Sequence, residues 1–188
     1  MIETEEAVRR FIEGEQEAFS RIVRRWEKKV YNLAWRMLGN REDAQDVTQD
    51  TFLSVFRSIR TLRDPRSFST WIYQITLNHC RARRRFRPSD VSLEDAVSGP
   101  AGDENGFHAP PASRRGQESV EIRDILCKAM TGISEDHRTA IILKEYLGLS
   151  LEEVARVMEC PLSTAKSRVY HGLRGVLRNL KRLKVLDS

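Results

Sequence analysis

The chain has 188 residues, of which 40% are hydrophobic and 7% aromatic, so it can form one domain or two small ones with largely aliphatic cores. The net charge of +5 is consistent with a polyanionic partner. No apolar run approaches the roughly 18 residues of a membrane span, and the acidic N-terminus does not resemble a signal peptide. The cysteines Cys80, Cys127 and Cys160 are odd in number and widely spaced. This indicates a reducing cytoplasm and argues against a disulfide framework.

Nearly every segment has hydrophobic residues at helical spacing, which predicts an all-α protein. A short first helix, capped by Thr4, is expected to end near Gly14, and a longer one to cover about residues 15–39. Asn40 is then expected to cap a third helix that reaches about Ile59. The inner face of this third helix is predicted to bury Ala44, Val47, Thr51, Phe52, Val55 and Phe56.

The opposite face of the third helix is acidic and carries Asp43, Asp46, Gln49 and Asp50. Asp46 and Asp50 are four residues apart, so they share a helix face and repel each other. Such residues are usually a solvated surface. In an otherwise basic half of the chain, they also suit the docking of a basic partner.

The segment from Pro65 to Ser89 contains no Asp or Glu. Asp64 and Pro65 are predicted to be the cap and the first-turn proline of a helix of about 20 residues. Aromatic residues crowd its first half and arginines its second: Phe68, Trp71, Tyr73, Arg81, Arg83, Arg84, Arg85 and Arg87. This composition suits either the holding of a nucleic-acid strand or an amphipathic core helix with a solvated tail. Trp71 is expected to lie at least partly in the core.

Residues 89–117 hold four of the ten glycines and three of the six prolines, and no helical periodicity continues through them. They carry more acidic than basic residues, whereas the segments on either side are basic. We interpret them as a flexible linker. The sequence therefore predicts two small helical domains, over residues 1–88 and 118–188.

The second domain has the pattern of a helix-turn-helix. After a helix over about residues 120–131 and another beginning after Ser134, the segment 150–153 (SLEE) forms a capping box. A break at residues 159–162 follows, and Ser163 is predicted to cap the final helix. A helix, a short turn and a capped helix are typical of DNA-binding proteins, although an ordinary helical hairpin remains the alternative. The residues expected to contact phosphates and base edges are Lys166, Ser167 and Arg168.

The sequence gives little support for an enzyme such as a nuclease. It contains no clustered His, Asp and Glu metal motif, no Ser–His pairing and no phosphate-binding glycine loop. His79 and Cys80 are adjacent, and neighbouring helical residues point about 100° apart, so the pair is a poor metal site.

Four segments in order resemble the bacterial RNA polymerase sigma factors of the extracytoplasmic-function (ECF) group. They are AFSRIVRRWEKKVYNLAWRMLG, DAQDVTQDTFLSVFRSI, FSTWIYQITLNHCRARRR and ISEDHRTAIILKEYLGLSLEEVARVMECPLSTAKSR. The resemblance covers about residues 5–183. It implies a sigma-2-type helical bundle and a sigma-4-type helix-turn-helix domain, with no cofactor.

The resemblance also implies partners. These are core RNA polymerase, through its beta-prime clamp helices and beta flap, promoter DNA, and an anti-sigma factor. The residues at the polymerase position are Asp46, Gln49 and Asp50. A second position reads and melts the −10 element, and in the family a base is flipped into a pocket there. The residues at this position are Leu62, Arg63, Phe68, Asn78, Arg81, Arg84 and Arg85. Those at the start of the helix that reads the −35 element are Ser163, Thr164, Lys166, Ser167 and Arg168.

Three positions depart from the family pattern. Leu62 stands where relatives often have an aromatic residue, and Ser163-Thr-Ala replaces the frequent Gly-Thr-Val. Tyr170-His-Gly replaces a more basic segment, and a glycine within a helix costs about 1 kcal/mol relative to alanine. We therefore expect the last helix to bend near Gly172 or to contact fewer phosphates.

A transcription regulator that binds DNA without polymerase is the alternative function. The acidic face of the third helix separates the two hypotheses, because only a polymerase subunit needs it as a docking surface.

Overall fold

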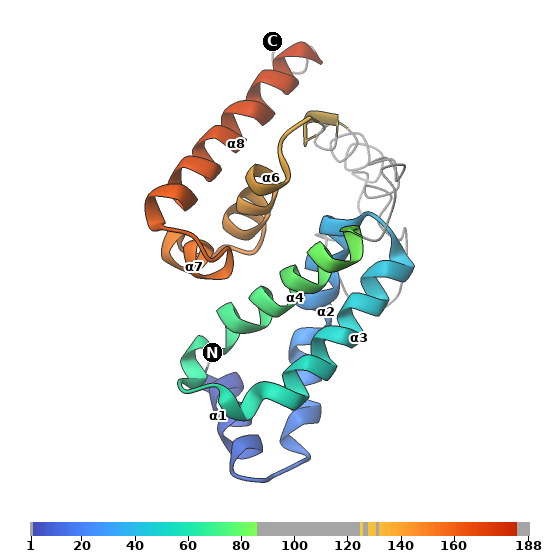
Figure 1. The fold of residues 1–188 in the computed structure, drawn as a ribbon, viewed down its shortest axis with the longest axis vertical. Helices are drawn as coiled ribbons and strands as arrows, with labels where there is room; N and C mark the ends of the chain where they lie inside the picture. The colour runs from blue at the N-terminus through green and yellow to red at the C-terminus, as the bar shows by residue number, and fades with distance from the viewer. Residues whose placement is uncertain (1, 86–124, 126–127, 131, 184–188) are drawn as a thin grey trace, which may run out of the picture.

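The computed structural model describes residues 2–85, 125, 128–130 and 132–183, and within these ranges the chain is helical with no strand (Figure 1). This confirms the predicted all-α fold. The predicted linker at 89–117 and most of the predicted helix at 120–131 lie outside the described residues. The N-terminal elements are α1 (Ile2–Ile12), α2 (Ala18–Leu38), α3 (Arg41–Ser58), the short 3-10 turns η1 (Ile59–Thr61) and η2 (Pro65–Ser67), and α4 (Phe68–Arg85). The C-terminal elements are α6 (Glu135–Ile141), the π-helix η3 (Ile142–Tyr146), α7 (Leu151–Val157) and α8 (Leu162–Arg182).

The junction between α2 and α3 forms as its sequence predicts. Gly39 ends α2 with a φ of 71°, a left-handed conformation that glycine adopts without strain, and its N–H donates to the carbonyl oxygen of Trp35 at 2.8 Å. Asn40 caps α3, since its side-chain oxygen accepts a hydrogen bond from the backbone N–H of Asp43 at 3.0 Å.

Two expectations for this half of the chain are wrong. Thr4 does not cap α1 but lies inside it, where it is buried and its hydroxyl accepts a hydrogen bond from the Trp26 indole N–H at 3.4 Å. Phe56 is 46% exposed rather than buried. Its ring lies at the margin of the bundle against Phe11 and Phe19, with ring centroids 5.5 and 5.1 Å away.

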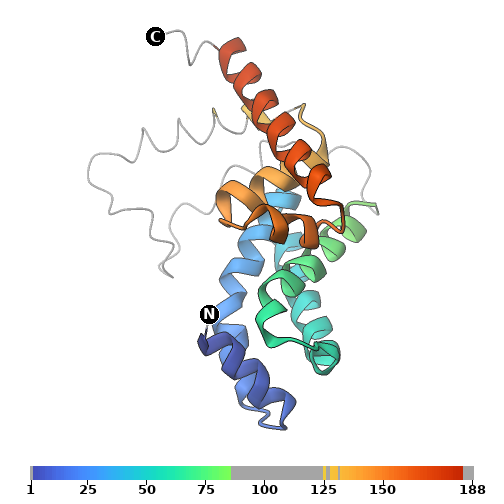
Figure 2. The ribbon, with the colours of Figure 1, turned by 90° about the vertical axis from the view of Figure 1, so that its left-hand side faces the viewer.

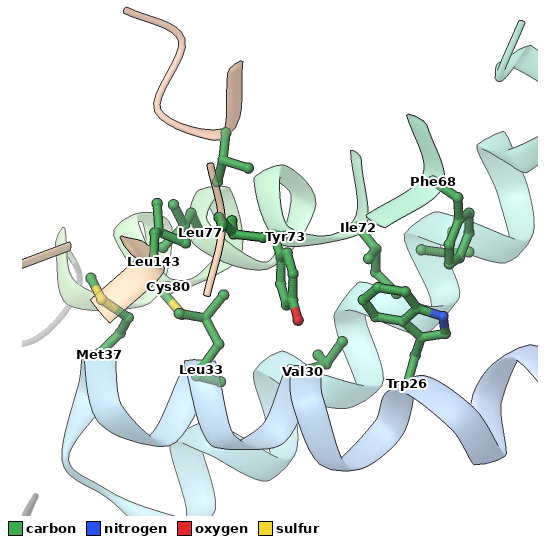
Figure 3. Close-up of a cluster of buried hydrophobic side chains, with 14 of the residues drawn as sticks. Trp26, Val30, Leu33, Met37, Phe68, Ile72, Tyr73, Leu77, Cys80 and Leu143 are labelled. Atoms are coloured by element: carbon green, nitrogen blue, oxygen red, sulfur yellow. The ribbon is translucent and has the colours of Figure 1, made fainter. Parts of the chain in front are cut away.

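The N-terminal core forms where α4 packs against α2. The Trp26 ring meets Phe68 and Tyr73 edge-on, at centroid distances of 5.6 and 5.5 Å (Figure 3). Phe68 is 1% and Tyr73 4% exposed, and this burial raises the pKa of Tyr73 to about 12. Trp71 is half-buried, with its ring 6.0 Å from that of Phe68. The aromatic half of the Pro65–Ser89 segment therefore serves mainly the core, as expected for Trp71.

The C-terminal helices also start largely at their predicted caps. Ser134 accepts from the backbone N–H of His137, and Ser150 and Glu153 form the complete capping box of α7. The prediction for Ser163 is wrong, because α8 begins at Leu162, two residues before the start that a Ser163 cap implies. Pro161 is the residue before the helix, and its carbonyl oxygen accepts from the backbone N–H of Ala165 at 3.0 Å, which leaves Ser163 inside the first turn.

α8 is continuous from Leu162 to Arg182, so Gly172 does not interrupt it. Gly172 is buried where α8 crosses α6. A Cβ atom at this position would lie 2.8 Å from Cδ1 of Ile141 and 3.1 Å from the carbonyl oxygen of His137. The glycine therefore allows close contact between the two helices.

The two groups of helices pack against each other, and α7 contacts α4 (Figure 2). Leu143 of η3 is fully buried and lies beside Leu33 and Met37 of α2 and Leu77 and Cys80 of α4 (Figure 3). One continuous apolar cluster thus joins the N-terminal and C-terminal helices.

We predict that Gly172→Ala destabilises the protein by about 1–3 kcal/mol, because the new methyl group meets the backbone of α6 and outweighs the gain in helix propensity. Thermal unfolding followed by circular dichroism measures the change. Gly175→Ala, three residues further along α8, is the matched control. Its Cβ would lie 3.4 Å from Ile133 Cγ1, an ordinary contact, so it should be neutral or stabilising. Equal midpoints for the two variants would contradict the packing role of Gly172.

Candidate functional site

The acidic face of α3 is exposed at three of its four predicted positions. Asp46, Gln49 and Asp50 all lie at the surface. Asp43 does not belong to this surface, because it is 2% exposed and turned toward α4. We call Asp46, Gln49 and Asp50 the acidic ridge.

Arg83 ties the acidic ridge to α4. Its Nε donates to Oδ1 of Asp43 at 2.8 Å, and a terminal nitrogen donates to Oδ2 of Asp46. The hydrogen bond with Asp43 is the main reason that the pKa of Arg83 is raised. Sequence reasoning grouped Arg83 with the other arginines of its segment, because spacing alone does not show which arginine meets an acid 40 residues away.

The predicted DNA-binding side chains of α4 lie on its outer surface. Asn78 is exposed, and one Arg81 terminal nitrogen lies 3.5 Å from its side-chain oxygen. Arg84 and Arg85 are also exposed, and Arg84 forms an ion pair with Glu135 at 3.2 Å. The C-terminal half of α4 thus presents one amide and several guanidinium groups together.

The turn before α4 is partly buried. Arg63 is exposed and Leu62 is half-buried in extended conformation. Asp64 caps η2, accepting from the backbone N–H of Arg66 at 3.0 Å, and Pro65 follows at the first position, as predicted. Phe68, by contrast, is part of the core and packs against Trp26. Its ring is therefore not free to stack on a base.

The start of α8 presents a polar surface. Ser163, Lys166 and Ser167 are exposed, while Ala165 faces inward and is fully buried. Thr164 is half-buried. Together with α7 and its capping box, this end of α8 forms the predicted helix-turn-helix.

Arg168 differs from its neighbours at the start of α8. It is half-buried and forms an ion pair with Asp136 of α6. Its guanidinium group therefore helps to hold α8 against α6.

His79 and Cys80 lie in different surroundings. The His79 ring nitrogen lies 2.9 Å from the Ser54 hydroxyl, whereas Cys80 is fully buried and desolvation raises the pKa of its thiol to about 12. Within the described part of the chain, no three His, Cys, Asp or Glu side chains gather where they could hold a metal ion. No described helix is both long and apolar enough to cross a membrane.

Comparisons with known proteins identify two family regions. Residues 22–88 match sigma-70 region 2, and residues 123–174 match sigma-70 region 4. The first match contains the acidic ridge and α4, and the second contains the helix-turn-helix.

Curated relatives match over nearly the whole chain. The RNA polymerase sigma-H factor of Pseudomonas aeruginosa is 33% identical over 95% of this chain and 94% of its own length. The ECF RNA polymerase sigma factor SigW of Bacillus subtilis is 30% identical over 90% of this chain and 92% of its own.

Solved structures share the fold. CnrH, determined in complex with the cytosolic domain of CnrY, is similar with a TM-score of 0.70 and 20% identity, over 96% of this chain and 98% of CnrH. The sigma factor RpoE of Bartonella quintana, determined with the anti-sigma factor NepR, has a TM-score of 0.65 and 23% identity, over 87% of this chain and 96% of RpoE.

Both family regions occur in order, and curated relatives are 30% and 33% identical along almost the full length. The chain therefore belongs to the ECF sigma factors, the subunits that direct bacterial RNA polymerase to its promoters.

Proposed function

We propose that this sigma factor divides its task among three surfaces. The acidic ridge binds core RNA polymerase, the turn at residues 62–64 with the outer face of α4 reads and melts the −10 element, and the start of α8 reads the −35 element. The observation that carries this proposal is the surface arrangement of the first bundle. An exposed acidic ridge on α3 and an exposed basic end of α4 lie on one small domain, at the residues that match sigma-70 region 2.

The acidic ridge suits a basic helical partner such as the beta-prime clamp helices. Asp46, Gln49 and Asp50 offer two carboxylates and an amide from one helix face. Arg83 donates a hydrogen bond to Asp46. The Asp46 side chain is nevertheless 51% exposed, so an approaching basic group can reach it. Arg83 itself acts as a positioning residue that fixes α3 relative to α4.

The outer face of α4 suits an unpaired DNA strand. Flipping a base costs a few kcal/mol, and binding by stacking and hydrogen bonds recovers about 1–3 kcal/mol per base. Asn78 offers both a donor and an acceptor to a base edge, and Arg81, Arg84 and Arg85 are suited to the neighbouring phosphates. Leu62 and Arg63 lie in the turn that precedes α4, whereas the buried Phe68 shapes the turn without touching DNA.

The start of α8 suits the major groove. Ser163, Lys166 and Ser167 are exposed on one end of the helix, and small side chains there permit close approach to the bases. Thr164 is half-buried and contributes at the margin. Arg168 reaches DNA only if it exchanges Asp136 for a phosphate.

The protein performs no catalysis of its own in this scheme. It acts in the cytoplasm, where polymerase transcribes. The structures of CnrH and RpoE were each determined with a protein partner, and the partner of RpoE, NepR, is an anti-sigma factor. We propose that an anti-sigma factor also restrains this chain.

Replacing Asp46 and Asp50 together by asparagine should weaken binding to core polymerase at least about tenfold, because two charges that face a basic partner are lost while side-chain shape is kept. Fluorescence titration of labelled protein with core enzyme measures this. The control is Glu13→Gln with Glu27→Gln, which removes the same charge from exposed positions elsewhere. An unchanged dissociation constant for the ridge variant would show that the acidic ridge is not the surface that binds core polymerase.

Asn78→Ala should slow promoter opening about tenfold while leaving closed-complex binding nearly unchanged, because a flipped base is held only after melting. Stopped-flow fluorescence with holoenzyme, on a promoter selected from a randomised library, separates the two steps. Gln16→Ala removes an exposed amide outside this face and serves as the control. Equal losses on closed duplex and on a preformed bubble would exclude the flipped-base role.

Lys166→Ala should reduce the slope of log affinity against log salt by about one, as expected when one phosphate contact is lost. Holoenzyme binding to duplex promoter DNA at several salt concentrations gives the slope. Lys181→Ala, at the far end of α8, should leave it unchanged. If the slope is the same in wild type and Lys166→Ala, Lys166 does not contact a phosphate.

A further inference from the structure

A groove lies between α1 and α2, outside the three surfaces assigned above. It has a volume of about 590 Å³, and Thr4, Ala7 and Ile22 are among the residues that line it. Its charged lining consists of four arginines and two glutamates, namely Arg10, Arg21, Arg24, Arg25, Glu3 and Glu6. Since the guanidinium groups outnumber the carboxylates, the groove favours an anionic ligand.

The basic residues of α2 form a stripe along one side of the helix. Arg24 and Arg25 follow Arg21 by three and four residues, and Lys28 follows one turn later. Residues at these spacings share a helix face, and all four are exposed. The stripe is about 10 Å long, because an α-helix rises about 1.5 Å per residue. It is therefore long enough to meet successive phosphates of one nucleic-acid strand.

The carboxylates beside these arginines hold them only weakly. Glu3 of α1 pairs with Arg25, and Glu15 pairs with Arg21. All four side chains are well exposed, and exposed ion pairs contribute little to stability because water screens them. Within the described residues, Arg24 forms no ion pair. A phosphate can therefore bind Arg24 directly and replace the carboxylates at the other two arginines.

The groove adjoins the turn that we assign to the −10 element. α1 contacts η2 and α4, and it lies beside the start of α4 (Figure 1). Trp26 connects the two places, since its indole N–H donates to the Thr4 hydroxyl in the groove and its ring packs against Phe68. The exposed Arg66 of η2 adds a further cation between them. A strand held at the turn can therefore continue into the groove.

We propose that the groove between α1 and α2 binds the sugar–phosphate backbone of the promoter strand next to the bases held by the turn and α4. The inference rests on the −10 role proposed for the turn and α4. Arg21, Arg24 and Arg25 contact phosphates and carry no base specificity. Glu3 opposes this binding, because its carboxylate occupies Arg25 when DNA is absent.

The test uses holoenzyme and a promoter template with a preformed bubble, and affinity is measured at several salt concentrations. Arg24→Gln removes a cation without breaking an ion pair, whereas Glu3→Gln removes the opposing carboxylate. The matched controls are Arg9→Gln and Glu13→Gln, which change exposed residues outside the groove lining. Thermal midpoints verify that all four variants keep the fold.

The two variants should change strand binding in opposite directions. Arg24→Gln should reduce the slope of log affinity against log salt by about 0.7, as expected when one single-strand phosphate contact is lost. At physiological salt it should weaken binding about three- to tenfold, whereas Glu3→Gln should strengthen it about two- to fivefold. The controls should match wild type. On a closed duplex promoter all variants should bind alike, because the groove takes the melted strand.

A shortened template locates the contact. If the unpaired strand ends directly at the −10 bases on both sides, Arg24→Gln should bind as well as wild type. A loss that persists on this template would overturn the proposal, because the phosphate at Arg24 would not belong to the adjoining strand.

Two other results would also overturn the proposal. If Arg24→Gln and Glu3→Gln both match their controls on the full bubble, the groove binds no strand. That outcome leaves the −10 surface intact, since Asn78→Ala tests it separately. If Arg24→Gln weakens binding to core polymerase and keeps the wild-type salt slope on DNA, the groove binds a protein and not a phosphate backbone.

Discussion

The packing of α4 against α2 is the constraint on which the rest of the first domain depends. Trp26 holds Phe68 and Tyr73 in the core, and this fixes the rotation of α4 about its axis. A helix that buries Tyr73, Leu77 and Cys80 turns Asn78 out to the surface, and it leaves Gln74 and Arg81 half-buried. The aromatic residues therefore serve DNA indirectly in our proposal, because they decide which polar residues face outward.

Charged residues that look alike in sequence divide between structure and surface. Arg83 is used to join α4 to α3 through Asp43 and Asp46, and Arg168 is engaged with Asp136. The basic groups free to meet a phosphate are consequently fewer than the arginines and lysines in the two basic segments. An acidic partner on a neighbouring helix is enough to change the role of each one.

Polar side chains of α4 also link the two domains. A face of α4 that carries donors suited to DNA is equally suited to carboxylates, and Glu135 and Glu159 supply them from the same chain. The apolar cluster around Leu143 adds a non-specific contribution that brings these groups together. The two groups of helices therefore meet through a packed apolar interface as well as through a few exposed polar contacts.

The sequence by itself determined the helical class, most helix ends and the exposed acidic ridge, because periodicity, glycine and capping residues act over one or two turns. Asn40, Gly39, Ser134 and the capping box at 150–153 are examples. Only the tertiary structure decided which members of a helix face are buried. Asp43 turned inward to Arg83, Phe68 entered the core and Gly172 allowed α8 to approach α6. Each of these depends on a partner distant in the sequence, and local spacing carries no information about such partners.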